Sequence, residues 1–161
     1  MNDQIKLFEY RFIALHERSI MAVGMVASKK LFLQPLGDMS AIRSLTFGES
    51  LLRSAAAVEQ SFGGITTRLW DDPFEWTLPE ELSTSEKIKS YLHVVEETRK
   101  KGFRSFASDA DLMKQIPAPE DLTSIFELLL QTLARAEHFQ GRALAILRMI
   151  ADAPLPRKLY P

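Results

Sequence analysis

The 161-residue chain contains no cysteine, so disulfide bonds, thiolate metal ligands and cysteine nucleophiles are excluded. It also lacks an excess of charge of either sign, because 20 Lys and Arg residues stand against 21 Asp and Glu residues, a net charge of −1. This balance argues against nucleic acid or an anionic membrane bound through bulk charge. We expect neither partner.

Long hydrophobic runs are missing as well. The longest, residues 20–27, is far shorter than the about 20 residues that a membrane-spanning helix needs. The N-terminal segment carries Asp3, Glu9 and Glu17 where a signal peptide would be basic and then apolar. We therefore expect a cytoplasmic protein, and from its length a single domain over residues 1–161.

The sequence shows no strand-like alternation, and four segments instead have helical periodicity. We expect helices over residues 4–29, 40–62, 83–101 and 121–150. The last is the longest pattern, and its apolar positions recur at spacings of three, four and seven: Leu122, Ile125, Leu129, Leu133, Ala136, Ala143, Leu147 and Ile150. Four long helices without strands predict an all-α protein, an up-down four-helix bundle.

Glycine is scarce, and its positions carry information. We expect Gly63 and Gly64 to cap the second helix and Gly102 to end the third. Gly141 falls inside the last helix, where it costs about 1 kcal/mol relative to alanine. We interpret Gly141 as a position of close helix packing rather than of ligand contact.

A long connection rich in aromatic residues lies between the second and third helices, at residues 66–82. It holds Trp70, Phe74 and Trp76, and its prolines forbid a long helix. Because so many aromatic side chains need apolar cover, we expect this loop to pack over one end of the bundle or against a second subunit. We rank this covering role above ligand binding, and we predict a homodimer.

The chain has only three histidines, His16, His93 and His138, on three different predicted helices. Metal binding by one helix usually needs two histidines on one face, four residues apart, and no such pair exists. We expect His16 to be exposed or at the rim of the core, and His93 to be exposed. The sequence has no nucleophile elbow, no glycine-rich phosphate loop and no serine–histidine–aspartate order that stands out, and it assigns no catalytic residue.

Glu49 lies on the apolar stripe of the second helix, where a carboxylate needs a partner. We predict that it faces Arg135 across the bundle. Polar bundle interiors are where helical proteins place ligands. We therefore expect a ligand pocket at one end of the bundle interior, formed by Glu49, Gln131, Arg135, His138 and Arg142.

The segment FELLLQTLARAEHFQGRALAIL, together with TLPEELSTSEKIKSYL, VEETR and DADL, resembles the DinB/YfiT-like family of metalloenzymes over nearly the whole chain. The resemblance implies a four-helix bundle that often pairs into dimers. It also implies a divalent metal, zinc or nickel, held by one histidine of the second helix and two of the fourth. Some relatives transfer or open low-molecular-weight thiols, or isomerise maleylpyruvate.

This chain departs from the family at the metal ligands. If Gly141 is set on the family glycine, Arg135 and Phe139 fall on the two ligand positions of the fourth helix. A shift of one residue would place His138 on one of them and Ala134 on the other. The second helix contains no histidine. We therefore expect no metal cofactor.

Two functions follow from these observations. The first is a degenerate DinB-like protein with a polar pocket that binds a small ligand, anionic among the options, or that serves as an interaction module. The alternative is a DinB/YfiT-like metal-dependent enzyme of thiol transferase or hydrolase type, retaining a partial site around His138 and Glu49. We favour the first because the ligand set is missing.

Overall fold

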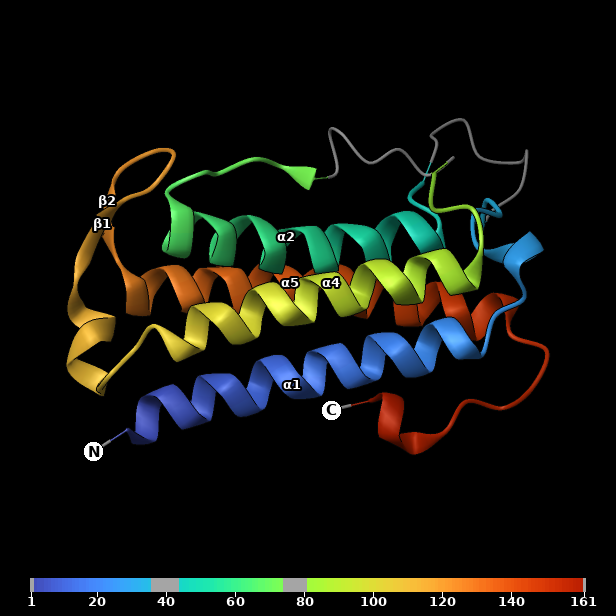
Figure 1. The fold of residues 1–161 in the computed structure, drawn as a ribbon. Helices are drawn as coiled ribbons and strands as arrows, with labels where there is room; N and C mark the ends of the chain where they lie inside the picture. The colour runs from blue at the N-terminus through green and yellow to red at the C-terminus, as the bar shows by residue number, and fades with distance from the viewer. Residues whose placement is uncertain (1, 36–43, 74–80, 161) are drawn as a thin grey trace.

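The computed structural model describes residues 2–35, 44–73 and 81–160. Four long helices lie side by side (Figure 1) and are α1 (Asp3–Gly24), α2 (Phe47–Thr67), α4 (Ser85–Arg104) and α5 (Ile125–Ile150). The predicted all-α four-helix bundle is confirmed. In the part of the chain that the structure describes, none of the helices has the length and hydrophobicity needed to cross a membrane.

Short elements join and cover the four helices. The described residues include the 3-10 turns η1 (Ser28–Lys30), η3 (Asp109–Met113) and η4 (Arg157–Leu159). A hairpin of two three-residue strands, β1 (Gln115–Pro117) and β2 (Leu122–Ser124), precedes α5, with Ile116 opposite Thr123 in an antiparallel register. This hairpin lies at the end of the bundle where α2 ends and α5 begins (Figure 1).

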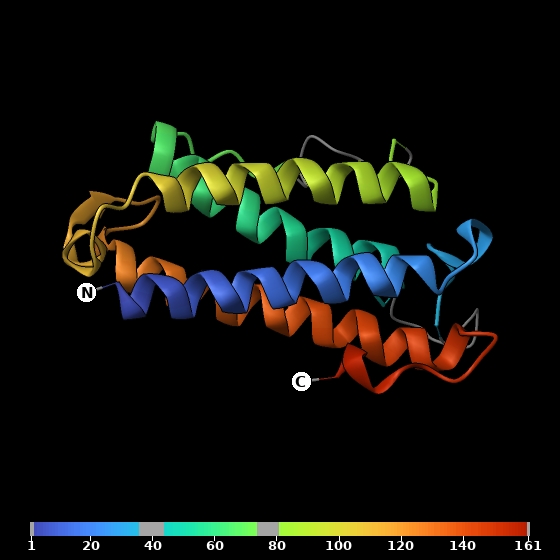
Figure 2. The same cartoon turned by 60° about the horizontal axis from the view of Figure 1, so that its bottom comes forward.

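The helices run in the order up-down-down-up. The start of α1 meets the segment after α4, where the Gln4 backbone N–H donates to Asp109 Oδ2 at 3.1 Å. Ser54 and Ser61 of α2 reach residues 136 and 132 of α5, so these two helices are antiparallel. α2 crosses obliquely behind α1 and α4 (Figure 2). Because α2 and α4 run in the same direction (Figure 1), the chain has to return along the bundle between the end of α2 and the start of α4. That return explains why a long connection stands between these two helices.

An aromatic cluster forms the core where α1, α2 and α4 meet. The rings of Phe12 and Phe62 are 5.2 Å apart edge to face, and those of Phe62 and Phe103 are also 5.2 Å apart. Such edge-to-face and tilted pairs add about 0.5–1.5 kcal/mol each beyond their burial. All three side chains are buried, and together they fix the register between the three helices.

Two glycines expected to end helices lie inside them instead. α2 continues past Gly64 to Thr67, and α4 continues past Gly102 to Arg104. A Cβ on Gly102 would lie 2.3 Å from Phe62 Cδ1, and one on Gly64 would lie 2.2 Å from Trp70 Cε3. The predicted stops are therefore wrong, because each glycine makes room for an aromatic ring lying on the helix.

Gly141 differs from Gly64 and Gly102, because no aromatic ring of the described residues lies against it. A Cβ there would meet no described atom within 4 Å, and the residue is exposed. The predicted close helix packing at this position is therefore wrong for the part of the chain that the structure describes.

The helix boundaries differ from those predicted where side-chain caps decide them. Thr46 caps α2, since its Oγ1 accepts the Glu49 N–H at 3.2 Å while the Glu49 carboxylate accepts the Thr46 N–H at 2.8 Å. α2 therefore begins at Phe47 rather than residue 40, and the intervening residues 40–43 lie outside the described residues. Ser124, rather than Asp121 or Thr123, caps α5 by accepting the Glu127 N–H.

Two further predicted boundaries shift for local reasons. α1 ends at Gly24 rather than residue 29, because the chain leaves the helix and forms the separate turn η1. At α4 the cap is Thr84, one residue later than predicted, whose Oγ1 accepts the Lys87 N–H. In the long connection, Trp70 is described, whereas Phe74 and Trp76 lie outside the described residues.

Candidate functional site

A groove of about 580 Å³ lies between the second half of α2, the first half of α5 and the loop that joins β1 to β2. Its volume falls in the range of about 300–1,000 Å³ that is typical of ligand sites. Most of its lining comes from the β1–β2 loop and from one face of α5. The lining residues are Ala57, Gln60, Ser61, Trp70, residues 118–123, Glu127, Leu128, Gln131, Thr132 and Arg135.

Trp70 forms one wall of this groove and is held in place. Its ring lies against Gly64, where a side chain would collide with it. Gln60 Nε2 donates to the Trp70 carbonyl oxygen at 3.0 Å. The indole is half-buried and packs against the core. An aromatic surface is therefore fixed beside the groove before any ligand arrives.

The floor of the groove is a buried pair of hydroxyl groups. Ser61 Oγ and Thr132 Oγ1 lie 2.6 Å apart, and Thr132 donates to the Leu128 carbonyl oxygen at 2.7 Å. The Ser61 hydroxyl can then donate to Thr132. These bonds tie α2 to α5, so the floor is rigid.

The groove has opposite charges at its two ends. At the hairpin end, Glu127 accepts hydrogen bonds from Thr123 Oγ1 at 3.3 Å and from Gln131 Nε2 at 3.2 Å. Glu120 and Asp121 add two more carboxylates there. Arg135 stands eight residues beyond Glu127 on α5, which is about 12 Å along the helix axis. The hairpin end is therefore acidic and the far end basic.

Two of the five predicted pocket residues, Gln131 and Arg135, line this groove. His138 and Arg142 are exposed on α5, and the His138 ring lies 5.3 Å from that of Phe139. Glu49 is buried in the capping box at the start of α2. The five residues do not line one cavity of the described chain.

The predicted pairing of Glu49 with Arg135 inside the bundle is wrong. Arg135 is exposed and lies beside Ser61 in the groove. Ser61 is twelve residues after Glu49, about 18 Å along α2. The backbone N–H that Glu49 accepts explains how its carboxylate tolerates burial.

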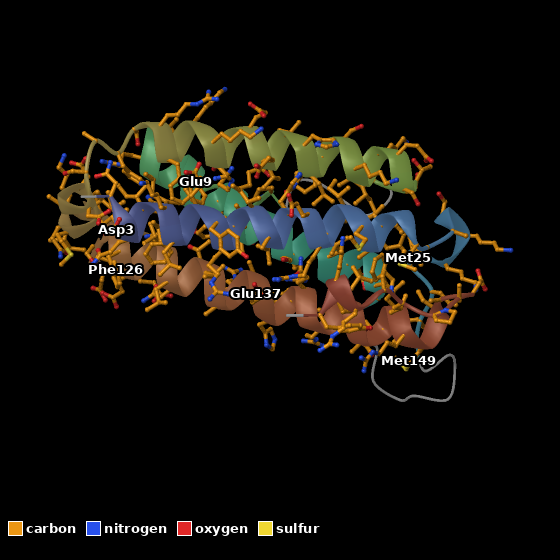
Figure 3. The ribbon with its side chains drawn as sticks, turned by 90° about the horizontal axis from the view of Figure 1, so that it is seen from below. Asp3, Glu9, Met25, Phe126, Glu137 and Met149 are labelled. Atoms are coloured by element: carbon orange, nitrogen blue, oxygen red, sulfur yellow. The ribbon has the colours of Figure 1, made fainter. Side chains whose placement is uncertain are left out.

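A polar cluster that the sequence did not predict lies between α1 and α4. Arg99 is 2% exposed, and its Nε and Nη2 donate to the two carboxylate oxygens of Glu96 at 2.8 and 2.7 Å. Nη1 donates to Glu9 of α1 at 3.4 Å, and Figure 3 shows Glu9 on α1 near α4. Burial opposes the charged form of Arg99, but hydrogen bonds and charge from Glu96 and Glu9 outweigh it and raise its pKa.

The same seam brings two histidines together. The rings of His16 on α1 and His93 on α4 have centroids 5.7 Å apart at an interplanar angle of 60°. His16 is half-buried, which agrees with the predicted exposed or rim position, and His93 is exposed, as predicted. Burial lowers the pKa of His16, the charge of Glu96 opposes this, and His93 adds to the lowering. Each histidine stands alone on its helix, so only the packing of α1 on α4 could reveal the pair.

The seam between α1 and α5 is polar too, but its groups satisfy one another. Gln140 is buried and donates to the Leu15 carbonyl oxygen at 2.7 Å and to Ser19 Oγ at 2.8 Å. Arg18 donates to Gln140 Oε1 at 2.8 Å and pairs with Glu137, which Figure 3 shows between α1 and α5. This network joins the two helices and engages both the amide nitrogen and the amide oxygen of Gln140.

The divalent metal that the family resemblance implies does not fit the residues at its expected positions. Those on α5 carry Arg135, a permanent cation that repels a metal ion, and Phe139, which has no donor atom. Within the described residues, histidines and carboxylates nowhere form a group of three or more placed to hold a metal ion. Comparison with known protein families, curated proteins and solved structures finds no match to this chain.

Proposed function

We propose that this chain is a DinB/YfiT-like protein that binds a small molecule, without a metal, in the groove between α2, α5 and the hairpin. The single observation that supports this most is the groove itself. It has the volume of a ligand site and a tryptophan wall fixed by Gly64 and Gln60. It also contains Arg135, a group able to bind a carboxylate through two parallel hydrogen bonds.

The charge distribution narrows the class of ligand. A ligand with a cationic group at the acidic hairpin end and a carboxylate at Arg135 would be matched at both ends. Glu127 and Arg135 are about 12 Å apart along the helix, and an extended chain spans at most about 3.3–3.6 Å per residue. The groove therefore suits a peptide of about three or four residues with free termini, its middle lying against Trp70.

Calorimetric titration with tri- and tetrapeptides tests this proposal. Each peptide is used with free termini, with an acetylated amino end and with an amidated carboxyl end. We expect the free form to bind best and Arg135→Gln to weaken it by at least about tenfold, which corresponds to 1.4 kcal/mol. The same substitution should have little effect on the amidated form, which has no carboxylate to lose.

Arg142→Gln is the matched control, because Arg142 is exposed on the same helix but lies outside the groove. The affinity of the Arg142→Gln variant for the free peptides should equal that of the unsubstituted protein. The proposal is wrong if no peptide with free termini binds, or if the two arginine substitutions have equal effects.

The alternative enzyme would need His138 and Glu49 to act in one site. The structure places His138 on the exposed face of α5 and the Glu49 carboxylate in the cap of α2. Glu49 is thereby engaged by a backbone N–H, and this arrangement gives no support to an acid–base pair.

A further inference from the structure

His16 and His93 meet across the seam between α1 and α4, and the groove does not use them. Among the described residues, no hydrogen bond engages either imidazole. The ring nitrogens of one half-buried and one exposed histidine therefore remain available. Two neutral imidazoles on neighbouring helices are a common way for proteins to hold zinc, copper or nickel.

We propose that His16 and His93 form a two-histidine site for a divalent transition-metal ion of the copper, nickel and zinc class. Water would complete the coordination, because the site faces solvent through His93. This site lies on α1 and α4, whereas the ligand positions that the family resemblance implies lie on the second and fourth helices of the bundle. It does not depend on the groove.

The spacing of the two rings fits this proposal. An imidazole nitrogen binds zinc at about 2.0–2.1 Å, so two rings sharing one ion have centroids about 5–6 Å apart. The observed separation is 5.7 Å. Binding requires that rotation about the side-chain bonds aims one nitrogen of each ring at a shared ion.

The charged groups beside the histidine pair are paired with one another. Glu96, Arg99 and Lys100 act electrostatically on His16, one carboxylate against two cations. Arg99 is already engaged by Glu96 and Glu9, and Lys100 by Glu97 at 2.8 Å. Each of these two cations is therefore paired with at least one carboxylate, which partly offsets its repulsion of a metal ion.

A metal ion at this position would join two helices far apart in the sequence. Because the two histidines are not held together in the unfolded chain, the ion would bind the folded state preferentially and raise the thermal midpoint. Copper should bind most tightly of the three, as expected for nitrogen ligands.

The test uses protein without a histidine tag, titrated with copper(II), nickel(II) and zinc(II) chlorides at pH 7.5 by calorimetry. We expect one ion per chain, with copper the tightest. His16→Gln and His93→Gln should each weaken binding by more than about tenfold, and each should abolish the metal-dependent rise in thermal midpoint. Circular dichroism without metal checks that both variants fold.

His138→Gln is the matched control, because His138 is the third histidine and is exposed on α5. It should leave both the affinity and the stoichiometry unchanged. Electron paramagnetic resonance of the copper form should show two nitrogen ligands in the unsubstituted protein and one in either pair variant.

The proposal is overturned if no stoichiometric site appears, if His138→Gln removes it, or if either pair variant keeps the full affinity. Arg135→Gln, which impairs the proposed groove, should leave the metal titration unchanged. Failure of the groove proposal and failure of this one are therefore distinguishable.

Discussion

Gly102 and Gly141 are both glycines inside long helices, yet the structure predicts opposite effects when each is replaced by alanine. A Cβ on Gly102 would lie 2.3 Å from Phe62 Cδ1, closer than two non-bonded carbon atoms can approach. Phe62 is fully buried, and its ring packs against those of Phe12 and Phe103, so it cannot move aside without disturbing them. A Cβ on Gly141 would meet no described atom within 4 Å.

The magnitudes follow from two opposing contributions. Replacing glycine by alanine within a helix favours folding by about 0.8–1.0 kcal/mol through helix propensity. Forcing an extra methyl group into a packed core costs about 1–3 kcal/mol. Gly141→Ala should therefore stabilise the protein by about 1 kcal/mol. Gly102→Ala should leave it between unchanged and about 2 kcal/mol less stable.

Urea denaturation followed by circular dichroism measures both free energies of unfolding. In a thermal scan, each 1 kcal/mol should shift the midpoint by about 2–4 °C for a chain of this size. Removing the ring in a Gly102→Ala, Phe62→Ala double variant should remove the clash, so the two substitutions should not be additive. Equal stability of Gly102→Ala and Gly141→Ala would refute the reasoning.

Three other predictions test the remaining parts of the structure. Arg99→Ala should destabilise the protein by about 3–5 kcal/mol in denaturant titration, because it leaves the buried carboxylate of Glu96 without its partner, whereas the exposed Arg135→Ala should cost about 1 kcal/mol or less. Hydrogen bonds from Lys114 and from backbone N–H groups lower the pKa of Asp111 from 3.8 to about 2, so its contribution to stability is present above pH 3.8 and is lost as the pH falls through 2. Asp111→Asn should accordingly lower the thermal midpoint at pH 7 and lower it much less at pH 2, where half of the folded protein has this carboxyl protonated. The homodimer predicted from the sequence should appear as a single dimeric species at micromolar concentration in analytical ultracentrifugation, and a monomer there would contradict it.

The four helices could be predicted because each carries its own periodic stripe. Six of the eight predicted stripe positions are buried in α5: Ile125, Leu129, Ala136, Ala143, Leu147 and Ile150. Leu133 is half-buried, and Leu122 is exposed because it lies in β2, before the helix begins. The periodicity records which face of a helix is apolar, and that information is local to the helix. The direction of α4 is not local, because it depends on how the connection after α2 returns along the bundle.

The glycines show why local rules fail at particular positions. Gly64 and Gly102 have the sequence context of helix ends, yet each lies under a ring that comes from elsewhere in the chain. Gly141 has the context of a packed position, yet no described residue approaches it. The sequence shows that a glycine has no side chain, but it does not show which neighbouring residue occupies the space that a side chain would need.

The candidate groove could be predicted only in part for the same reason. Gln131 and Arg135 were identified because they are polar residues on the last helix, and they do share a cavity. The cavity opens towards the hairpin rather than towards the bundle interior, because both residues are on the exposed side of α5. The hairpin itself has only three residues in each strand, too few for alternation to indicate it.

The two histidines meet where the antiparallel helices α1 and α4 pack on one another. Phe12 of α1 also lies 6.0 Å from Phe103 of α4, ring centre to ring centre. His16 is four residues from Phe12, about 6 Å along α1, whereas His93 is ten residues from Phe103, about 15 Å along α4. The phenylalanine pair alone therefore does not place the histidines opposite one another, and the meeting depends on the packing along the whole seam. The histidine pair is therefore a consequence of how α1 and α4 pack, which is why neither helix alone could indicate it.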